Sequence, residues 1–168
     1  PPECQGIAMT GQDQSRRLIK VTLDPDVFAK GTPDQEQERA VAIYDLVEQN
    51  SFCVPDHARG PYALFISMHD SKLALDIRDY NNASLVVYIL SLSPFRRILK
   101  DYFLVCETYY DAIRTATPAQ IEAIDMGRRA LHNEGAALLE QRLEGKIDCD
   151  FDTIRRLFTL VTALHWRG

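Results

Sequence analysis

The sequence predicts a two-layer α+β domain in which three to four helices cover one face of a mostly antiparallel sheet of about four strands. The prediction rests first on periodicity, because most segments that alternate apolar and polar residues precede the segments with helical spacing. It rests secondly on composition: 46% of the residues are hydrophobic and 26% are charged, as in ordinary globular chains. No repeat, low-complexity tract or linker divides the 168 residues. One domain, from residue 16 to residue 168, is therefore expected.

The first fifteen residues differ from the rest of the chain. They are polar and contain two prolines and two glycines, and Met9 is a plausible true start. We expect residues 1–15 to be disordered or not part of the native chain, and we leave them out of the functional argument.

Four segments have the pattern of strands. Arg17–Leu23 alternates apolar and polar side chains, and three further runs follow at 62–68, 72–78 and 85–92. Short turn sequences separate the last three runs, which predicts an antiparallel meander joined by 17–23 as a fourth strand. The run 85–92 is almost entirely apolar, so it could be covered on both faces.

Helix starts are marked by hydroxyl residues followed by proline. Thr32 with Gln35 predicts a capping box and a helix over about 33–49. Ser93 and Thr117 each precede a proline, which predicts helices over 94–115 and from 118 onward.

Apolar stripes, glycines and a capping residue add detail to the predicted later helices. The broad apolar stripe of the helix over 94–115 predicts that it is largely enclosed. Gly127 and Gly135 interrupt the next helix as close-packing points or partial breaks, and Asp150 or Asp152 caps a last helix.

Charge and motif content exclude several classes of function. A net charge of -5 and a pI near 5.3 argue against general binding to nucleic acid or to anionic membranes. No apolar run is long enough to span a membrane, and no dinucleotide or P-loop motif occurs, so no cofactor is expected. The four cysteines form no CxxC pair and the four histidines are far apart, which favours free thiols in a reducing cytoplasm and no metal site.

The first candidate site is the helix start after Ser93. Exposed N–H groups there, together with the guanidinium groups of Arg96 and Arg97, are suited to hold a phosphate or a carboxylate. The alternative is that Arg97 pairs with Asp101 on the next turn and that the helix end is solvated.

The second candidate site lies on the next helix and combines an acid, arginines and a titratable base. Its members are Asp125, Arg128, Arg129, His132 and Glu134. Asp125, Arg128 and His132 fall on neighbouring turns and would face one pocket. The alternative is that Asp125 pairs with the arginines while His132 packs or caps.

Aromatic residues between Tyr102 and Tyr110 could line a groove, but at helical spacing core packing is the more common outcome. If Tyr110 or Trp166 is exposed, self-association is the use we expect.

Long stretches, above all LSPFRRILKDYF and CETYYDAIRTATPAQIEAIDMGRRALHNEG, with the closing FDTIRRLFTLVTALHWRG, resemble an uncharacterised family of small alphaproteobacterial proteins, the UPF-type family 0262. The resemblance covers nearly all of 18–168 and implies a free-standing bacterial, cytoplasmic protein. It brings no known activity and no functional residues.

Three hypotheses follow. The first is a non-catalytic binding or regulatory module that forms a homo-oligomer and offers Arg96, Arg97, Arg128 and Arg129 to an anionic small molecule or an acidic protein. The second is a small enzyme that uses His132 as acid or base, oriented by Asp125 or Glu134 and supported by an arginine. The third is a structural subunit of a larger assembly.

Overall fold

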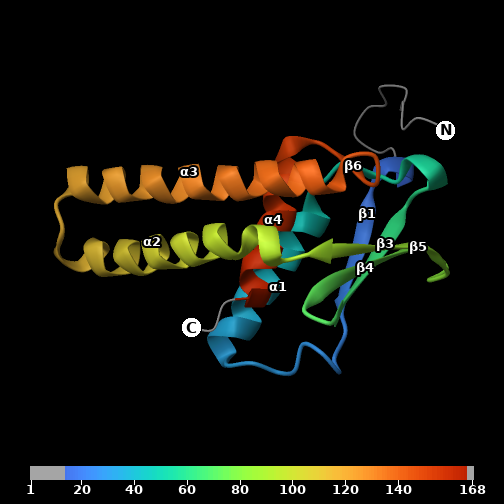
Figure 1. Cartoon of the computed structure of the whole chain (residues 1–168), viewed down its shortest axis with the longest axis horizontal. Helices are drawn as coiled ribbons and strands as arrows, with labels where there is room; N and C mark the ends of the chain where they lie inside the picture. The colour runs from blue at the N-terminus through green and yellow to red at the C-terminus, as the bar shows by residue number, and fades with distance from the viewer. Residues whose placement is uncertain (1–13, 166–168) are drawn as a thin grey trace.

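A computed structural model describes residues 14–165, and it has an α+β fold (Figure 1). Most of the expected N-terminal segment, and Trp166, lie outside the described residues. Helices α1 and α4 pack on the sheet side of the molecule, while α2 and α3 form a hairpin that extends away from it.

The main sheet has four strands in the order β1-β3-β4-β5. Their bounds are β1 (Leu18–Leu23), β3 (Tyr62–His69), β4 (Lys72–Asp79) and β5 (Ser84–Ser91). The predicted meander of β3, β4 and β5 is confirmed, and its first turn uses positive φ at Asp70 and Ser71. The fourth strand differs from the antiparallel arrangement that the sequence indicated, because β1 pairs parallel to β3. Helix α1 lies between the two strands in sequence and allows this crossover, which periodicity alone does not reveal.

The two faces of the sheet differ in cover. Leu64 and Ile66 on β3 pair with Ile77 and Leu75 on β4, and all four side chains are buried in the core. On the opposite face of β5, Val87 is 50% exposed and Ile89 is 49% exposed. The expectation that this apolar run is covered on both faces is therefore wrong, because β5 is an edge strand and the helices cover only one face.

Four helices accompany the sheet: α1 (Pro33–Glu48), α2 (Arg96–Thr115), α3 (Pro118–Leu143) and α4 (Phe151–His165). Thr32 forms the predicted capping box, and Thr117, predicted as a capping hydroxyl, forms a capping box with Gln120. Ser93 does not cap α2, since Ser93–Phe95 forms a 3-10 turn (η3) and the α-helix begins at Arg96 without a side-chain cap. Of the two predicted caps, Asp150 caps α4, because its carboxylate accepts a hydrogen bond of 2.8 Å from the Thr153 N–H.

Helix α4 forms the centre of the core, between α1 and α3. Nine of its fifteen residues are buried, among them Phe158. Gly135 on α3 faces this ring so closely that a Cβ atom would collide with Phe158, whereas a Cβ at Gly127 would meet nothing within 4 Å. Gly135 is thus a close-packing point, and α3 runs through both glycines without a break.

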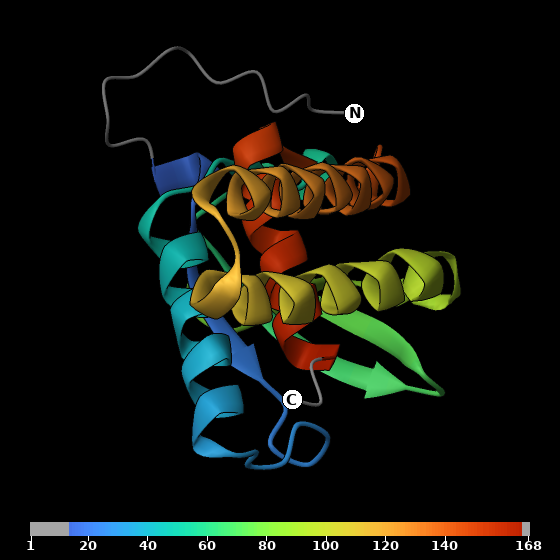
Figure 2. The same ribbon diagram turned by 90° about the vertical axis from the view of Figure 1, so that its left-hand side faces the viewer.

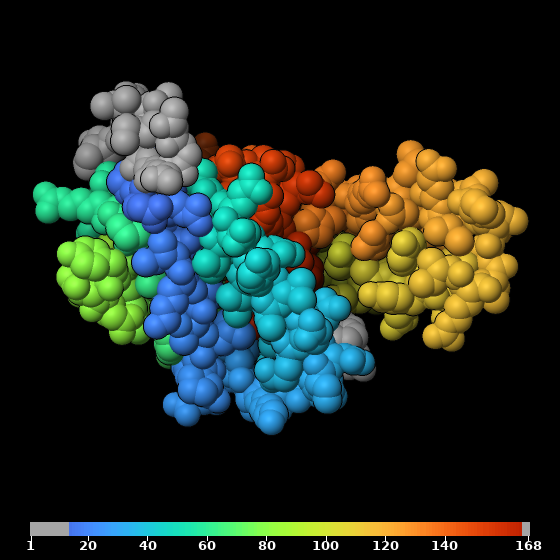
Figure 3. Space-filling view, turned by 180° about the vertical axis from the view of Figure 1, so that it is seen from behind, coloured from blue at the N-terminus to red at the C-terminus, as the bar shows by residue number. Residues whose placement is uncertain are grey.

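The hairpin of α2 and α3 leaves the core over its distal half (Figures 1 and 2). Only Ile98, Leu99 and Ala112 of α2 are buried, and Tyr110 is 60% exposed. The prediction that α2 is largely enclosed is wrong for this reason: its stripe meets the core only near the base. Figure 3 shows the hairpin protruding past α1 when the molecule is seen from behind.

A two-stranded sheet of β2 (Phe52–Cys53) and β6 (Asp148–Cys149) joins the loop before β3 to the start of α4. The Tyr62 hydroxyl donates a 2.7 Å hydrogen bond to the His57 carbonyl and stabilises the short 3-10 turn Pro55–His57 (η2). Cys106 and Cys149 are free thiols, but Cys53 is disulfide-bonded, which corrects the expectation for that residue. Within residues 14–165, none of the helices combines the length and apolar character that a membrane crossing requires.

Candidate functional site

The second predicted site lies at a cavity of about 1150 Å³ between the base of the hairpin and helices α1 and α4, which we call the hairpin cavity. Its charged and titratable lining includes Arg128, Arg129, His132, Arg155 and His165. Acidic side chains line it too, namely Asp34 and Glu38 on α1 and Glu107 on α2. Guanidinium and imidazole groups from α3 and α4 therefore face carboxylates from α1 and α2 across one space.

The two arginines of α3 share one carboxylate. Arg128 donates to Asp125 Oδ1 through Nε at 3.1 Å, and Arg129 lies 2.9 Å from Asp125 Oδ2. The Arg128 guanidinium also stacks over the Tyr109 ring, 4.8 Å from its centroid. Hydrogen bonding from Arg128 holds the pKa of Asp125 below its ordinary value. The alternative predicted for Asp125 is thus present: its carboxylate pairs with both Arg128 and Arg129.

His132 is held by α4. Its Nε2 lies 2.8 Å from Thr159 Oγ1, and the Thr159 hydroxyl donates to the Arg155 carbonyl at 3.1 Å. When the hydroxyl proton is directed at this carbonyl, the Thr159 oxygen accepts from His132 Nε2, and Nδ1 carries the lone pair. Nδ1 is buried and has no hydrogen-bond partner among the described residues.

Burial lowers the pKa of His132 to about 4, with further lowering by the positive charges of Arg155 and Arg128. The imidazole is therefore neutral at pH 7. The guanidinium groups of Arg155 and Arg128 place positive charge at the wall of the cavity that His132 also lines.

Arg155 belongs to neither of the two sites predicted from the sequence, and the structure places it at the cavity. It lines the hairpin cavity, and its buried Nε has no hydrogen-bond partner within the described part of the chain. Thr159 and Thr162 follow it on the same face of α4, at spacings of four and three residues. This polar stripe on an otherwise apolar helix was the sequence signal that could have identified the wall.

Tyr102 and Cys106 close the cavity on the α2 side. Burial raises the pKa of both groups, so the phenol and the thiol stay protonated at neutral pH. The Tyr102 ring lies 5.7 Å from the His132 ring and 6.5 Å from the Phe158 ring, centroid to centroid. Tyr102 thus combines the expected core packing with a place on the cavity wall, whereas Tyr110 is largely solvent-exposed.

The first predicted site is separate from the second. Arg96 and Arg97 are both exposed at the start of α2, and Arg97 pairs with Glu134 at 3.2 Å. Glu134 lies six residues beyond Arg128 on α3, about 9 Å along the axis and about 120° around it. The four arginines therefore do not converge on one pocket.

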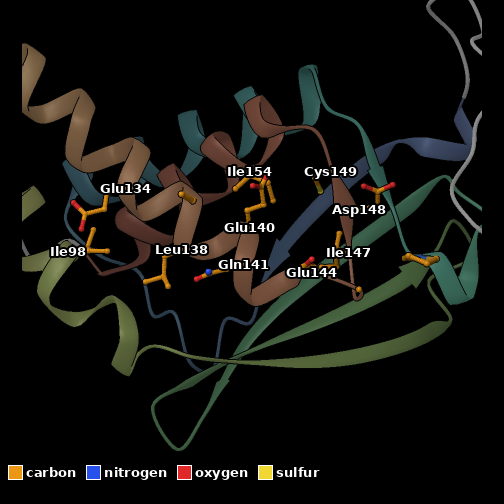
Figure 4. A pocket seen from close by; sticks show the side chains of 13 residues that line it. Ile98, Glu134, Leu138, Glu140, Gln141, Glu144, Ile147, Asp148, Cys149 and Ile154 are labelled. Atoms are coloured by element: carbon orange, nitrogen blue, oxygen red, sulfur yellow. The ribbon is translucent and has the colours of Figure 1, made fainter.

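Glu134 instead belongs to a second cavity of about 1050 Å³, which we call the acidic cavity (Figure 4). Its floor includes Ile98, Leu138, Ile147 and Ile154, and its carboxylates are Glu134, Glu140, Glu144 and Asp148. No basic side chain lines it within the described residues, so Arg96 and Arg97 stand beside a negative region that disfavours an anion.

The enzyme hypothesis required the carboxylate of Asp125 or Glu134 to contact and orient the His132 imidazole. Asp125 is engaged by Arg128 and Arg129, Glu134 is engaged by Arg97, and the hydrogen-bond partner of His132 is Thr159. Among residues 14–165, no group of three His, Cys, Asp or Glu side chains is arranged to hold a metal ion.

Comparison with known proteins identifies relatives over nearly the whole chain. A UPF0262 protein of Rhizobium leguminosarum biovar trifolii is 61% identical over 152 residues, which is 90% of this chain and 96% of the relative. A UPF0262 protein of Mesorhizobium japonicum is 57% identical over 162 residues, covering 95% of this chain and all of the relative. A UPF0262 protein of Methylobacterium radiotolerans is 56% identical over 152 residues, which is 90% of this chain and 94% of the relative.

No solved structure matches the chain. The family model described as an uncharacterised protein family, UPF0262, matches residues 15–167, so the protein belongs to the UPF0262 family.

Proposed function

We propose that this protein is a non-catalytic bacterial binding module that takes up a small carboxylate- or phosphate-bearing molecule in the hairpin cavity. Arg155 and Arg128 would hold the anionic group. Arg129, more exposed, would lie at the entrance. The proposal keeps the Arg-lined pocket inferred from sequence and replaces Arg96 and Arg97 by Arg155.

The observation that carries the proposal is the state of Arg155. A guanidinium offers five donors, and a buried donor without a partner costs about 1–3 kcal/mol. Nε of Arg155 is such a donor, in a cavity large enough for a small molecule. An anionic ligand would supply the missing acceptor, and bidentate pairing of a guanidinium with carboxylate or phosphate is strong and directional.

Electrostatics support the same ligand class at the inner wall. Arg155 and Arg128 both act on His132, which stays neutral and adds no positive charge of its own. The carboxylates of Asp34, Glu38 and Glu107 line the other walls. They favour a ligand that also carries an amino group, since an ammonium there would meet an opposite charge.

Binding is favoured over acid–base catalysis for two reasons. A histidine with a pKa near 4 is a weak base at pH 7. The carboxylates proposed to orient His132 are paired with arginines instead.

The test is a thermal-shift and calorimetric screen with inorganic phosphate, pyrophosphate, citrate, aspartate and glutamate. A ligand present at a hundred times its dissociation constant stabilises by about 2.7 kcal/mol, which raises the Tm of a domain of this size by about 5–10 °C. Arg155→Gln should weaken binding by about 10–100-fold, the loss expected for charge-assisted hydrogen bonds.

Arg156→Gln is the matched control, because Arg156 neighbours Arg155 on α4 but donates to the Gln49 carbonyl at 3.2 Å, outside the cavity. It should leave anion affinity unchanged. No stabilisation by any of these anions, or equal loss in the two variants, would overturn the proposal and move the weight to a protein partner or an assembly role.

A further inference from the structure

The main sheet has two edges, and the chain protects only one of them. At the β1 edge, a side chain occupies the outward main-chain groups of Leu18. Asn50 Oδ1 accepts a 2.9 Å hydrogen bond from the Leu18 N–H, and Asn50 Nδ2 donates a 2.9 Å hydrogen bond to the Leu18 carbonyl. The Arg17 carbonyl accepts from Tyr62 N on the β3 side, so the Leu18 groups point to the outer edge, where Asn50 occupies them.

Two more features of β1 discourage strand addition. The exposed Lys20 places a charge in the middle of the strand, and the register shifts between Leu18 and Lys20. Charges and bulges at an edge are common ways in which natural sheets avoid pairing with other chains.

The edge at β5 is less protected: among the described residues no side chain occupies its main-chain groups, and its register with β4 shifts only at its start, opposite Ile77 and Arg78. Its eight residues, SLVVYILS, contain no charge, no proline and no glycine. Its ladder with β4 is regular from Lys72↔Ser91 to Ile77↔Val86. Among the described residues, no backbone hydrogen bond joins β5 to any segment other than β4.

We infer that β5 pairs antiparallel with β5 of a second copy of this chain, forming a continuous eight-stranded sheet across a two-fold axis. Unpaired main-chain groups on a straight apolar edge are a template for another strand. A second copy fits because β5 is uncharged, so self-pairing opposes no like charges along the strand. The exposed side chains of Val87 and Ile89 would form one continuous apolar patch across the two copies.

Closure favours a dimer over a longer assembly. Pairing through β5 is isologous and consumes that edge in both copies. The edges that remain are the two β1 strands, in each of which Asn50 occupies the outward groups of Leu18 and Lys20 adds a charge. Helix α2 continues from β5 away from the sheet (Figure 1), so antiparallel pairing sends the two hairpins in opposite directions.

The test is the mass of the full chain by light scattering and sedimentation, over a range of concentrations. Twice the chain mass of 19.1 kDa is expected. The double variant Val87→Lys with Ile89→Lys should dissociate to 19.1 kDa, with a dimer at least tenfold weaker, because four ammonium groups would meet near the axis. Hydrogen exchange should show amides of 84–91 protected in a concentration-dependent manner.

Ile19→Lys is the matched control, since Ile19 is 39% exposed on the other edge strand and the same change there should leave the dimer intact. Circular dichroism confirms folding of each variant. A monomer at all concentrations would overturn the inference, as would a dimer that survives the β5 double variant but dissociates with Tyr110→Lys on the hairpin. These outcomes do not depend on anion binding, so the two proposals can fail separately.

Discussion

The base and the free end of the α2–α3 hairpin are made of similar residues but have different surroundings. At the base, Phe158 is fully buried and its ring lies against Gly135 on α3. At the free end, Tyr110 and Ile113 of α2 are at least half exposed. Apolar periodicity identifies the apolar face of a helix. Where the helix extends beyond the core, that face remains exposed because no other element covers it.

The largest contrast is expected between two aromatic rings. Phe158→Ala should destabilise the fold by about 3–5 kcal/mol, because it removes a buried ring and leaves a cavity in the core. Tyr110→Ala should change the free energy of unfolding by less than about 0.5 kcal/mol, as at other exposed sites. Urea denaturation of both variants measures the difference, and similar losses would mean that the free end is covered in solution.

The two glycines of α3 give the next contrast. Gly135→Ala should destabilise by about 1–3 kcal/mol, because the added methyl collides with the Phe158 ring. Gly127→Ala should stabilise by about 0.5–1 kcal/mol, since its surroundings are open and alanine has the better helix propensity. Thermal unfolding of the pair should give shifts of opposite sign, and shifts of the same sign would contradict the packing described here.

His132, at the base of the hairpin, should make the stability of the fold depend on pH. Its pKa is about 4 in the folded protein against an ordinary value of 6.5, so the unfolded chain binds more protons between these values. Stability should therefore be full above pH 6.5 and fall by about 1–2 kcal/mol as the pH drops from 7 to 5. Denaturation of His132→Phe at the two pH values should show that much less pH dependence, and an unchanged profile would place His132 in contact with solvent.

The smallest contrast separates the two arginines that share Asp125. Arg128→Ala should cost about 1 kcal/mol, because this half-buried guanidinium also stacks on Tyr109. Arg129→Ala should cost less than about 0.5 kcal/mol, since its ion pair is on the surface. Repeating both measurements in 0.5 M salt should reduce the small loss from Arg129→Ala further, and an equal cost for the two would exclude the stacking contribution.

Much of the fold could be predicted from the sequence, because local rules decide it. Thr32 and Thr117 begin their helices as capping boxes, and Asp70-Ser71 forms a turn between paired strands. Asp125 pairs with Arg128 and Arg129, as neighbours three and four residues apart on a helix are expected to do.

The candidate site could be predicted only in part. The cavity joins His132 to Thr159 and Arg155, which lie 27 and 23 positions further along the chain. Arg97 and Arg128 are on adjacent helices of one hairpin, yet they belong to different cavities of opposite character. Which charges meet depends on where α3 crosses α4, and that crossing depends on the contact of Gly135 with Phe158.

The sequence by itself determined the helices, the caps at Thr32 and Thr117, the strand alternation and the family, because each depends on residues close together along the chain. The tertiary structure alone decided that β1 runs parallel to β3, that the distal half of α2 is uncovered and that Arg155 faces His132. These outcomes depend on contacts between distant segments, whose free energies are set by burial and by hydrogen-bond partners that no local pattern specifies.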